Sequence, residues 1–283
     1  MGNPEETNAR LGFPADARLL IINADDFGMC HAANAATIQA MRAGIVSSTT
    51  VMTPCPWAPH ALRLLAENPD LAFGVHLTLI AEHTDYRWGP RAPRGLVPSL
   101  IDASGYFYRN DQRDALLAQA VLNEVEIEFR AQIAPVLAAG LSPTHLDWHC
   151  LADGGRTDIF ALTMALAKEF GLALRVHAPA SAERAQRAGF RTSDHGVLDS
   201  YSLAADDKSA QYIALLRDLP AGLSEWALHP SLGDAEAQAM EPSGWQVRKA
   251  DFDFLISAQA QQTLAEEGIE LVDFRRLQSA GPA

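Results

Sequence analysis

The chain has 283 residues, of which 48% are hydrophobic and 20% charged, as in an ordered globular protein with one large or two small α/β domains. Its formal net charge of −13 disfavours nucleic acids and anionic membranes, and we expect neither as a partner. We also expect a cytoplasmic location, because there is no signal-peptide pattern, no apolar run long enough to span a membrane, and no paired cysteine spacing.

Strand-like and helix-like segments alternate along most of the chain. Residues 1–17 are polar and lack hydrophobic periodicity, so we expect a flexible N-terminal segment. Apolar or β-branched runs predict strands, and amphipathic repeats that end at glycines predict helices. The strands are expected at 18–24, 46–52, 71–79, 143–147, 172–177, 190–198, 223–229 and 269–274, and the helices at 31–43, 58–67, 114–139, 158–170, 209–219 and 248–262.

This alternation predicts a mostly parallel sheet flanked by helices. Seven or eight strand–helix units suit a single α/β domain over residues 18–283, a distorted (β/α) barrel similar to a TIM barrel. Residues 82–113 interrupt the rhythm with prolines and aromatic residues. We expect a lid insertion there; the alternative is a surface excursion packed by its own aromatic side chains.

Polar residues suited to chemistry concentrate at the ends of the predicted strands. In a parallel barrel these ends converge on one face, where active sites lie. Asp25 and Asp26 end the first strand, and an extended backbone would point them to opposite sides. One carboxylate could then bind a metal while the other accepts a proton. The alternative is that the pair caps the helix at 31–43.

Four histidines and a further aspartate lie in or at the ends of later strands. His145, Asp147 and His149 would share one face of a strand, and two histidines with a carboxylate suit zinc or a similar divalent ion. A hydrogen-bonded His–Asp pair in a turn is the alternative. His76 is either another site residue or a core histidine. His229 is either a proton shuttle or a structural residue at the end of a strand.

Five motifs occur in order along the chain, and together they are quite specific. They are NADDFG at 23–28, GIVSSTT at 44–50, GVHLTL at 74–79, PTHLDWH at 143–149 and HP at 229–230. Their combination resembles the YdjC-like carbohydrate deacetylase family from about Arg18 to about Arg276. The resemblance implies a distorted (β/α) barrel, one divalent metal ion, and removal of an acetyl group from an N-acetylated amino sugar or glycoside.

The resemblance also implies a role for each matched residue. Asp26, His76 and His149 would bind the metal ion, zinc or magnesium. Asp25 would be the general base, and His229 would protonate the leaving amine. His145 and Asp147 belong to the same motif, and we expect them to contact the substrate or to support the ligands.

The chain departs from the family pattern after His149, where further histidines and a proline are common. Residues 150–156 read CLADGGR, so this loop is more acidic and, with two glycines, more flexible. We expect it to line the substrate pocket beside the metal, with Asp153 near the substrate. Such a wall favours an amine or a bulky neutral aglycone over a plain chitin fragment such as N,N′-diacetylchitobiose.

Two other functions agree with parts of this pattern. A metal-dependent amidase or isomerase would keep the barrel and the metal but act on a non-sugar substrate. A non-catalytic sugar-binding relative would be expected to lack a ligand or the base, yet all five matched residues are present. The expected partner is a small N-acetylated sugar. The sequence leaves open the metal identity, the exact substrate and the oligomeric state, for which a homodimer is one candidate.

Overall fold

The computed structural model describes residues 3–203 and 207–278. Parallel strands form one curled sheet in the order β5-β4-β3-β2-β1-β7-β6, and β8 pairs with the start of β1. The expected distorted (β/α) barrel is thereby confirmed, although it is open: within the described ranges β5 and β6 do not pair. The strands are β1 (Arg18–Phe27), β2 (Ser48–Val51), β3 (Phe73–Leu77), β4 (His145–Trp148), β5 (Ala173–Leu174), β6 (Val197–Asp199), β7 (Gly222–Leu228) and β8 (Ile269–Leu271).

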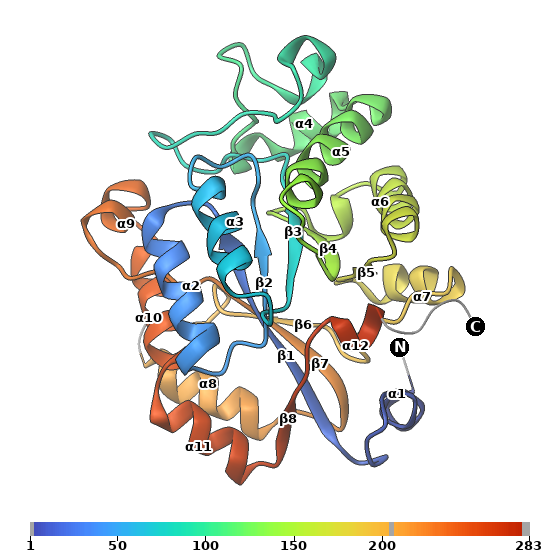
Figure 1. Cartoon of the computed structure of the whole chain (residues 1–283), viewed down its shortest axis with the longest axis vertical. Coiled ribbons are helices and arrows are strands. Elements are labelled where there is room, and N and C mark those ends of the chain that lie inside the picture. The colour runs from blue at the N-terminus through green and yellow to red at the C-terminus, as the bar shows by residue number, and fades with distance from the viewer. Residues whose placement is uncertain (1–2, 204–206, 279–283) are drawn as a thin grey trace.

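Helices follow most strands and cover the outside of the curled sheet (Figure 1). The first two cross-over helices have the predicted bounds, and the helix expected at 248–262 is divided in two because Ser257 caps a new helix. The helices are α1 (Pro4–Leu11), α2 (His31–Ala43), α3 (Ala58–Glu67), α4 (Arg113–Gln119), α5 (Leu122–Ala138), α6 (Thr157–Phe170), α7 (Pro179–Arg187), α8 (Lys208–Arg217), α9 (Ala235–Met240), α10 (Trp245–Leu255), α11 (Ala258–Glu266) and α12 (Arg275–Gln278). None of those described is long and apolar enough to cross a membrane.

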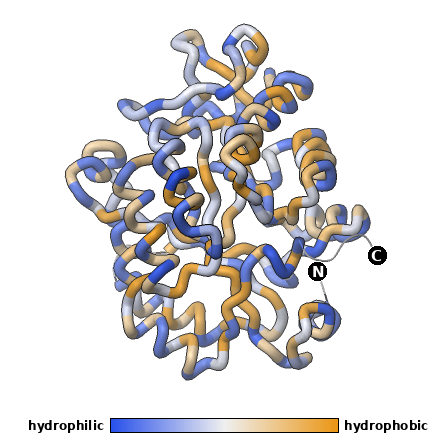
Figure 2. Tube along the Cα trace, in the orientation of Figure 1, coloured by the Kyte–Doolittle hydropathy of each residue, from blue (hydrophilic) through white to orange (hydrophobic). Residues whose placement is uncertain are grey.

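The central strand β1 is buried on both faces, as expected for a parallel sheet covered by helices. Leu20 and Ile22 pack in the cluster that holds Phe254 of α10, whereas Leu19 and Ile21 pack in a second cluster inside the curl. Figure 2 shows hydrophobic residues along the strands and polar residues on the outward turns of the helices. This alternation places residue 23, and beyond it Asp25, on the side that faces the interior.

The N-terminal segment contains a helix that the sequence analysis did not expect, and the flexibility of the segment stays a prediction. Its residues 4–11 form α1, whose polar side chains make long-range contacts. Asn8 is buried and donates hydrogen bonds to the carbonyl oxygens of Ala15 and Ala17 at 3.0 and 2.8 Å. Thr7 donates to the carboxylate of Asp194 at 2.7 Å. Hydrophobic periodicity gives no sign of this helix because Leu11 is its one buried hydrophobic residue and the contacts of Thr7 and Asn8 are polar.

The helix expected at 114–139 is also divided, at Ala120, whose ψ of 122° leaves the helical region. Contacts from elsewhere satisfy the backbone there. Arg156 donates to the carbonyl oxygen of Ala120 at 2.8 Å, and the hydroxyl of Ser99 accepts the N–H of Val121 at 2.9 Å. The prediction of one continuous helix was therefore wrong. Hydrophobic periodicity within residues 114–139 carries no information about Ser99 and Arg156, which stabilise the break.

Residues 82–113 form the excursion at the top of Figure 1, with short 3₁₀ helices η1 (Arg94–Leu96), η2 (Pro98–Leu100) and η3 (Asn110–Gln112). Trp88 and Phe107 are buried in the main hydrophobic cluster. Glu128 of α5 accepts the backbone N–H groups of residues 91 and 92, each at 2.9 Å. The segment is therefore packed by its own aromatic residues and bound to α5, and its role as a lid stays a prediction.

We predict that Gly74→Ala destabilises the fold where β3 packs closely against His145 of β4. A Cβ at residue 74 would lie 2.6 Å from both the ring and the carbonyl oxygen of His145, and both strands are buried. The expected loss is about 2 kcal/mol of unfolding free energy, measured by urea denaturation. Gly95→Ala, where no atom lies within 4 Å of the added Cβ, is the control and should change it by under about 0.5 kcal/mol. Equal stability of the two variants would contradict this account of the β3–β4 contact.

Candidate active site

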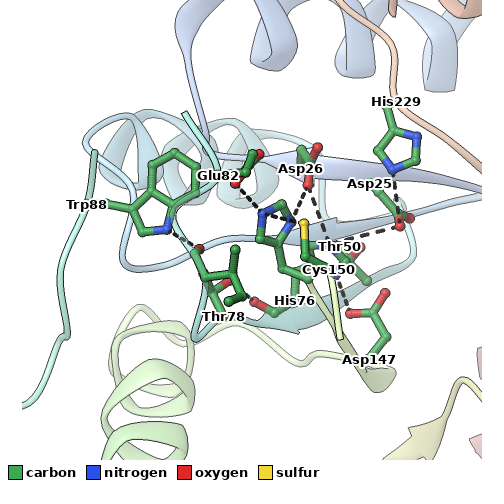
Figure 3. A network of polar contacts seen from close by, with 12 residues as sticks. Asp25, Asp26, Thr50, His76, Thr78, Glu82, Trp88, Asp147, Cys150 and His229 are labelled. Carbon is green, nitrogen blue, oxygen red and sulfur yellow. Dashed lines mark hydrogen bonds and ion pairs between the residues drawn. The ribbon is translucent and has the colours of Figure 1, made fainter. Parts of the chain in front are cut away.

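The carboxyl ends of four strands bring the residues of the candidate site together. Asp25 and Asp26 lie at the end of β1, His76 lies in β3, His149 follows β4 and His229 follows β7. Figure 3 shows Asp25, Asp26 and His76 turned toward one centre, with His229 beside Asp25. The structure thus brings together the five residues that the sequence singled out for metal binding and proton transfer.

A bulge in β1 turns both aspartates toward His76. The pairing with β2 passes from Ala24–Thr49 to Phe27–Val51, which leaves one extra residue in β1. Asp26 has a φ of 66°, a left-handed conformation that aspartate tolerates better than most residues. The expectation that the two side chains point to opposite sides was therefore wrong. Neither caps the following helix, since α2 is capped by Cys30.

The ligand atoms of Asp26, His76 and His149 all lie within 4.8 Å of one another. Asp26 Oδ1 is 3.0 Å from His149 Nδ1 and 3.4 Å from His76 Nε2, while its other oxygen binds Arg248 at 2.7 Å. Donors that share a divalent ion at about 2.1 Å lie roughly 3–3.5 Å apart. The spacing and the buried donor set therefore fit one such ion.

Each candidate ligand histidine has a carboxylate at its other ring nitrogen. Asp147 Oδ1 lies 2.7 Å from His76 Nδ1, and Glu82 Oε2 lies 2.7 Å from His149 Nε2. Such partners orient ligand histidines in metal sites. Burial alone would lower the pKa of His76, but Asp147 and Asp26 raise it to about 9. An ion that binds here must displace this proton.

Asp25 is held in its ionised form by a buried arginine. Arg175 places its two terminal nitrogens 2.8 and 2.9 Å from the two oxygens of Asp25, and the side-chain amide of Asn23 donates to Oδ1 at 2.7 Å. Although burial opposes ionisation, the Arg175 guanidinium holds the pKa of Asp25 well below its usual range. Asp25 Oδ2 also faces His76 and His229, with each Nε2 at 3.9 Å.

His229 lies at the outer edge of the cluster. Its backbone N–H donates to Asp251 at 2.8 Å, and its ring packs edge-on against Tyr201 with the ring centroids 4.9 Å apart. Its side chain is 18% exposed, and its Nδ1 has no hydrogen-bond partner among the described residues. The Nε2 of the imidazole therefore faces Asp25, its Nδ1 is buried without a partner, and part of the ring is exposed.

Two residues expected to contact the substrate or support the ligands are bonded elsewhere. His145 stacks on Phe274 with the ring centroids 3.5 Å apart, and burial lowers its pKa to about 3, so it is a neutral core residue. Asp153 accepts the backbone N–H groups of His177 and Ala178 at 2.8 and 2.9 Å, just before α7. Within the loop, residues 151 and 154 are buried. The loop after His149 thus packs against the protein through these two residues. The carboxylate of Asp153 accepts hydrogen bonds from the backbone.

Four residues of the site were missed by the sequence analysis. They are Glu82, Arg175, Glu225 and Arg248. A signal was available for two of them, because Arg175 and Glu225 are lone charges in strand-like segments and such charges need a partner when buried. Cys150 also lies close, with its sulfur 3.3 Å from His149 Nε2, and it forms a second candidate ligand group with His149 and Glu82.

Known proteins are similar to this chain over most of its length. The sequence profile of the YdjC-like protein family matches residues 19–266. Two relatives named carbohydrate deacetylase are each 32% identical to this chain. The one from Thermoanaerobacter pseudethanolicus matches 77% of this chain and 83% of its own length, and the one from Enterococcus faecalis 91% and 97%. A crystal structure from Enterococcus faecalis, provisionally described as a cellobiose-phosphate cleavage protein, is 30% identical, with a TM-score of 0.78 over 92% of this chain and 99% of that one.

We predict that Arg175→Met destabilises the protein by about 3 kcal/mol or more at pH 7, because it leaves buried carboxylates without their cation. Arg175 lowers the folded-state pKa of Asp25, so this stabilisation is present above the unfolded pKa of about 3.9 and is lost as pH falls through the folded pKa. The deficit of the variant should therefore keep its full size between pH 7 and about pH 5, and it should shrink as pH falls below about 4 in urea titrations.

Arg130→Met is the matched control, because Arg130 pairs with Glu126 and Glu169 on the surface. It should cost under about 1 kcal/mol. A deficit of Arg175→Met that stays constant with pH would show that its packing, and not its charge, holds the site.

Proposed function

Because the chain belongs to the YdjC-like protein family, we propose that it is a metal-dependent carbohydrate deacetylase that acts on an N-acetylated amino sugar or glycoside. The names of the two bacterial relatives support this class of activity. The single observation that carries the metal dependence is the convergence of Asp26, His76 and His149 within 4.8 Å. Three protein ligands leave a coordination position open for chemistry.

In this proposal Asp26, His76 and His149 hold one divalent ion, zinc or magnesium. Two imidazoles and one carboxylate suit zinc better than magnesium, which prefers oxygen ligands. The bound ion would lower the pKa of a water molecule and polarise the amide carbonyl. Asp147 and Glu82 orient the two imidazoles and raise their basicity as ligands.

Asp25 and His229 carry the proton transfers. Asp25 Oδ2 accepts a proton from the attacking water, and Arg175 keeps this carboxylate ionised at neutral pH. A C–O bond forms to the acetyl carbon as the amide C–N bond breaks. His229, whose Nε2 lies 3.9 Å from Asp25 Oδ2, donates a proton to the leaving nitrogen. Acetate and a free amino sugar are the products.

The other candidate functions make different predictions for the same site. An amidase or isomerase on a non-sugar substrate would release no acetate from N-acetylated sugars. A non-catalytic binding protein has no need of an ionised Asp25 beside a histidine on the cluster's outer edge, and here both are in place. Acetate release therefore separates the deacetylase from both.

We predict that Asp25→Asn and Asp26→Asn separate proton transfer from metal binding. Asp25→Asn should keep the metal and reduce acetate release by about 10²–10⁴-fold, because an amide cannot accept the proton. Asp26→Asn should lose both metal and activity, because Asp26 Oδ1 lies between the two histidines. Metal content by elemental analysis and acetate release from a panel of N-acetylglucosaminides are the measurements.

Asp153→Asn, whose carboxylate binds backbone N–H groups, is the control and should retain the metal. If Asp25→Asn loses the metal and Asp26→Asn keeps it, the two roles are exchanged. If the wild-type protein, reconstituted with metal, releases acetate from none of the panel, the proposed function is wrong.

A further inference from the structure

A hollow of about 230 Å³ opens beside the candidate site. Residues 82–85, at the start of the excursion after β3, form one wall, and residues 239–243, at the end of α9, form the other. The volume is a little below the usual range of drug-sized small-molecule sites, about 300–1,000 Å³. The hollow therefore suits a small group, such as the end of an aglycone, and not a large ligand.

One wall contacts a candidate metal ligand directly, and the other reaches one through a single intervening side chain. Glu82 lies 2.7 Å from His149 Nε2. On the other wall, Glu241 pairs with Arg248 at 2.6 Å, and Arg248 pairs with Asp26 at 2.7 Å. Glu82 thus borders both the candidate metal cluster and the hollow, and a substrate that reaches from one to the other must pass this side chain.

The lining of the hollow is acidic. Glu82, Asp85 and Glu241 contribute carboxylates, and neither lysine nor arginine is among the lining residues. Arg248 compensates Glu241 from behind, whereas exposed Asp85 has no ion pair or hydrogen bond within the described ranges. The hollow thus carries a negative charge that the protein itself does not neutralise.

His83 is a second and independent sign of a ligand. Its side chain lines the hollow and is only 6% exposed, yet its Nε2 has no hydrogen-bond partner among the described residues. Glu82 Oε1 is 3.4 Å away, a contact that becomes an ion pair only if the ring is charged. In the neutral ring a nitrogen without a proton can accept a hydrogen bond. Buried polar atoms seldom lack partners, so a donor from water or from a ligand is expected at this nitrogen.

We propose that this hollow binds a primary ammonium group carried by the substrate on the side remote from the acetamido group. The substrate class is then an N-acetylated amino sugar joined to an amine-bearing aglycone or sugar. His83 accepts a hydrogen bond from the ammonium group, while Asp85 and its neighbours supply the attracting charge. The inference rests on the proposed deacetylase function. The acidic wall that the sequence placed at Asp153 is thus provided by residues 82–85 and 241.

The direct test compares substrates that differ only in charge. N-acetyl-β-glucosaminides with aminoethyl and aminobutyl aglycones are paired with their hydroxyethyl and hydroxybutyl counterparts, and acetate release gives kcat/KM for each. We expect the better amine of the two to exceed its hydroxyl partner about fivefold at low salt, and the ratio to fall in 0.5 M NaCl because salt screens an exposed charge.

Variants of Asp85 test whether the preference for amine over hydroxyl substrates arises in the hollow. The amine-to-hydroxyl ratio should fall toward one in Asp85→Asn and below one in Asp85→Lys. Asp111→Asn, a change in the same excursion at a carboxylate paired with Arg109 on the surface, should leave both rates unchanged. A ratio that does not respond to Asp85→Lys would overturn the assignment.

The remaining outcomes separate the two proposals. Equal kcat/KM for the paired substrates in the wild-type protein would overturn the ammonium site and leave the deacetylase function standing. If no substrate releases acetate, the proposed deacetylase function is wrong. Calorimetric titration of the same substrate pairs into the metal-loaded protein then tests whether the hollow binds an ammonium group. Tighter binding of the amine then supports the site, and equal or absent binding rejects it.

Discussion

One buried guanidinium, that of Arg175, joins the two edges of the curled sheet. Arg175 follows β5 at one edge, and it contacts Glu225 of β7 next to the opposite edge as well as Asp25 of β1 and Asp147 of β4. Backbone pairing does not close the barrel in the described ranges, so this ion-pair network spans the gap. A cation among three carboxylates cannot neutralise all of them, and burial raises the pKa of Glu225 while Asp25 stays ionised. The same contact that holds the sheet together therefore sets the protonation state of the candidate base.

The site above this network is built from a local irregularity and two supported histidines. The bulge at Asp26 moves one carboxylate from its regular strand position into the space between His76 and His149. Asp147 and Glu82 then fix the two rings from behind. Left-handed backbone at a buried aspartate costs of order 1 kcal/mol or more, and such strain is found where function requires it. Glu82 also lines the acidic hollow, so the orientation of His149 is coupled to the part of the site that would bind the rest of the substrate.

The order of strands and helices and the convergence of the site residues could be predicted from the sequence, because hydrophobic periodicity and strand-end placement are local patterns. The ion pairs of Arg175 could not, since its partner Asp25 lies 150 residues away along the chain. The bulge at Asp26 could not either, because it depends on pairing with β2 and a single backbone torsion. The contacts of Asp153 were misjudged because the backbone N–H groups that donate to its carboxylate, just before α7, lie 24 and 25 residues away along the chain. The metal-binding and catalytic roles of the five matched residues stay predictions.

The most direct test of the central claim is a crystal structure of the protein grown with zinc, with anomalous diffraction recorded at the zinc absorption edge. The account predicts one strong anomalous peak at about 2.0–2.2 Å from Asp26 Oδ1, from His76 Nε2 and from a ring nitrogen of His149, with Arg175 still bound to Asp25. A peak coordinated instead by Glu82, His149 and Cys150, or none near Asp26, would contradict it.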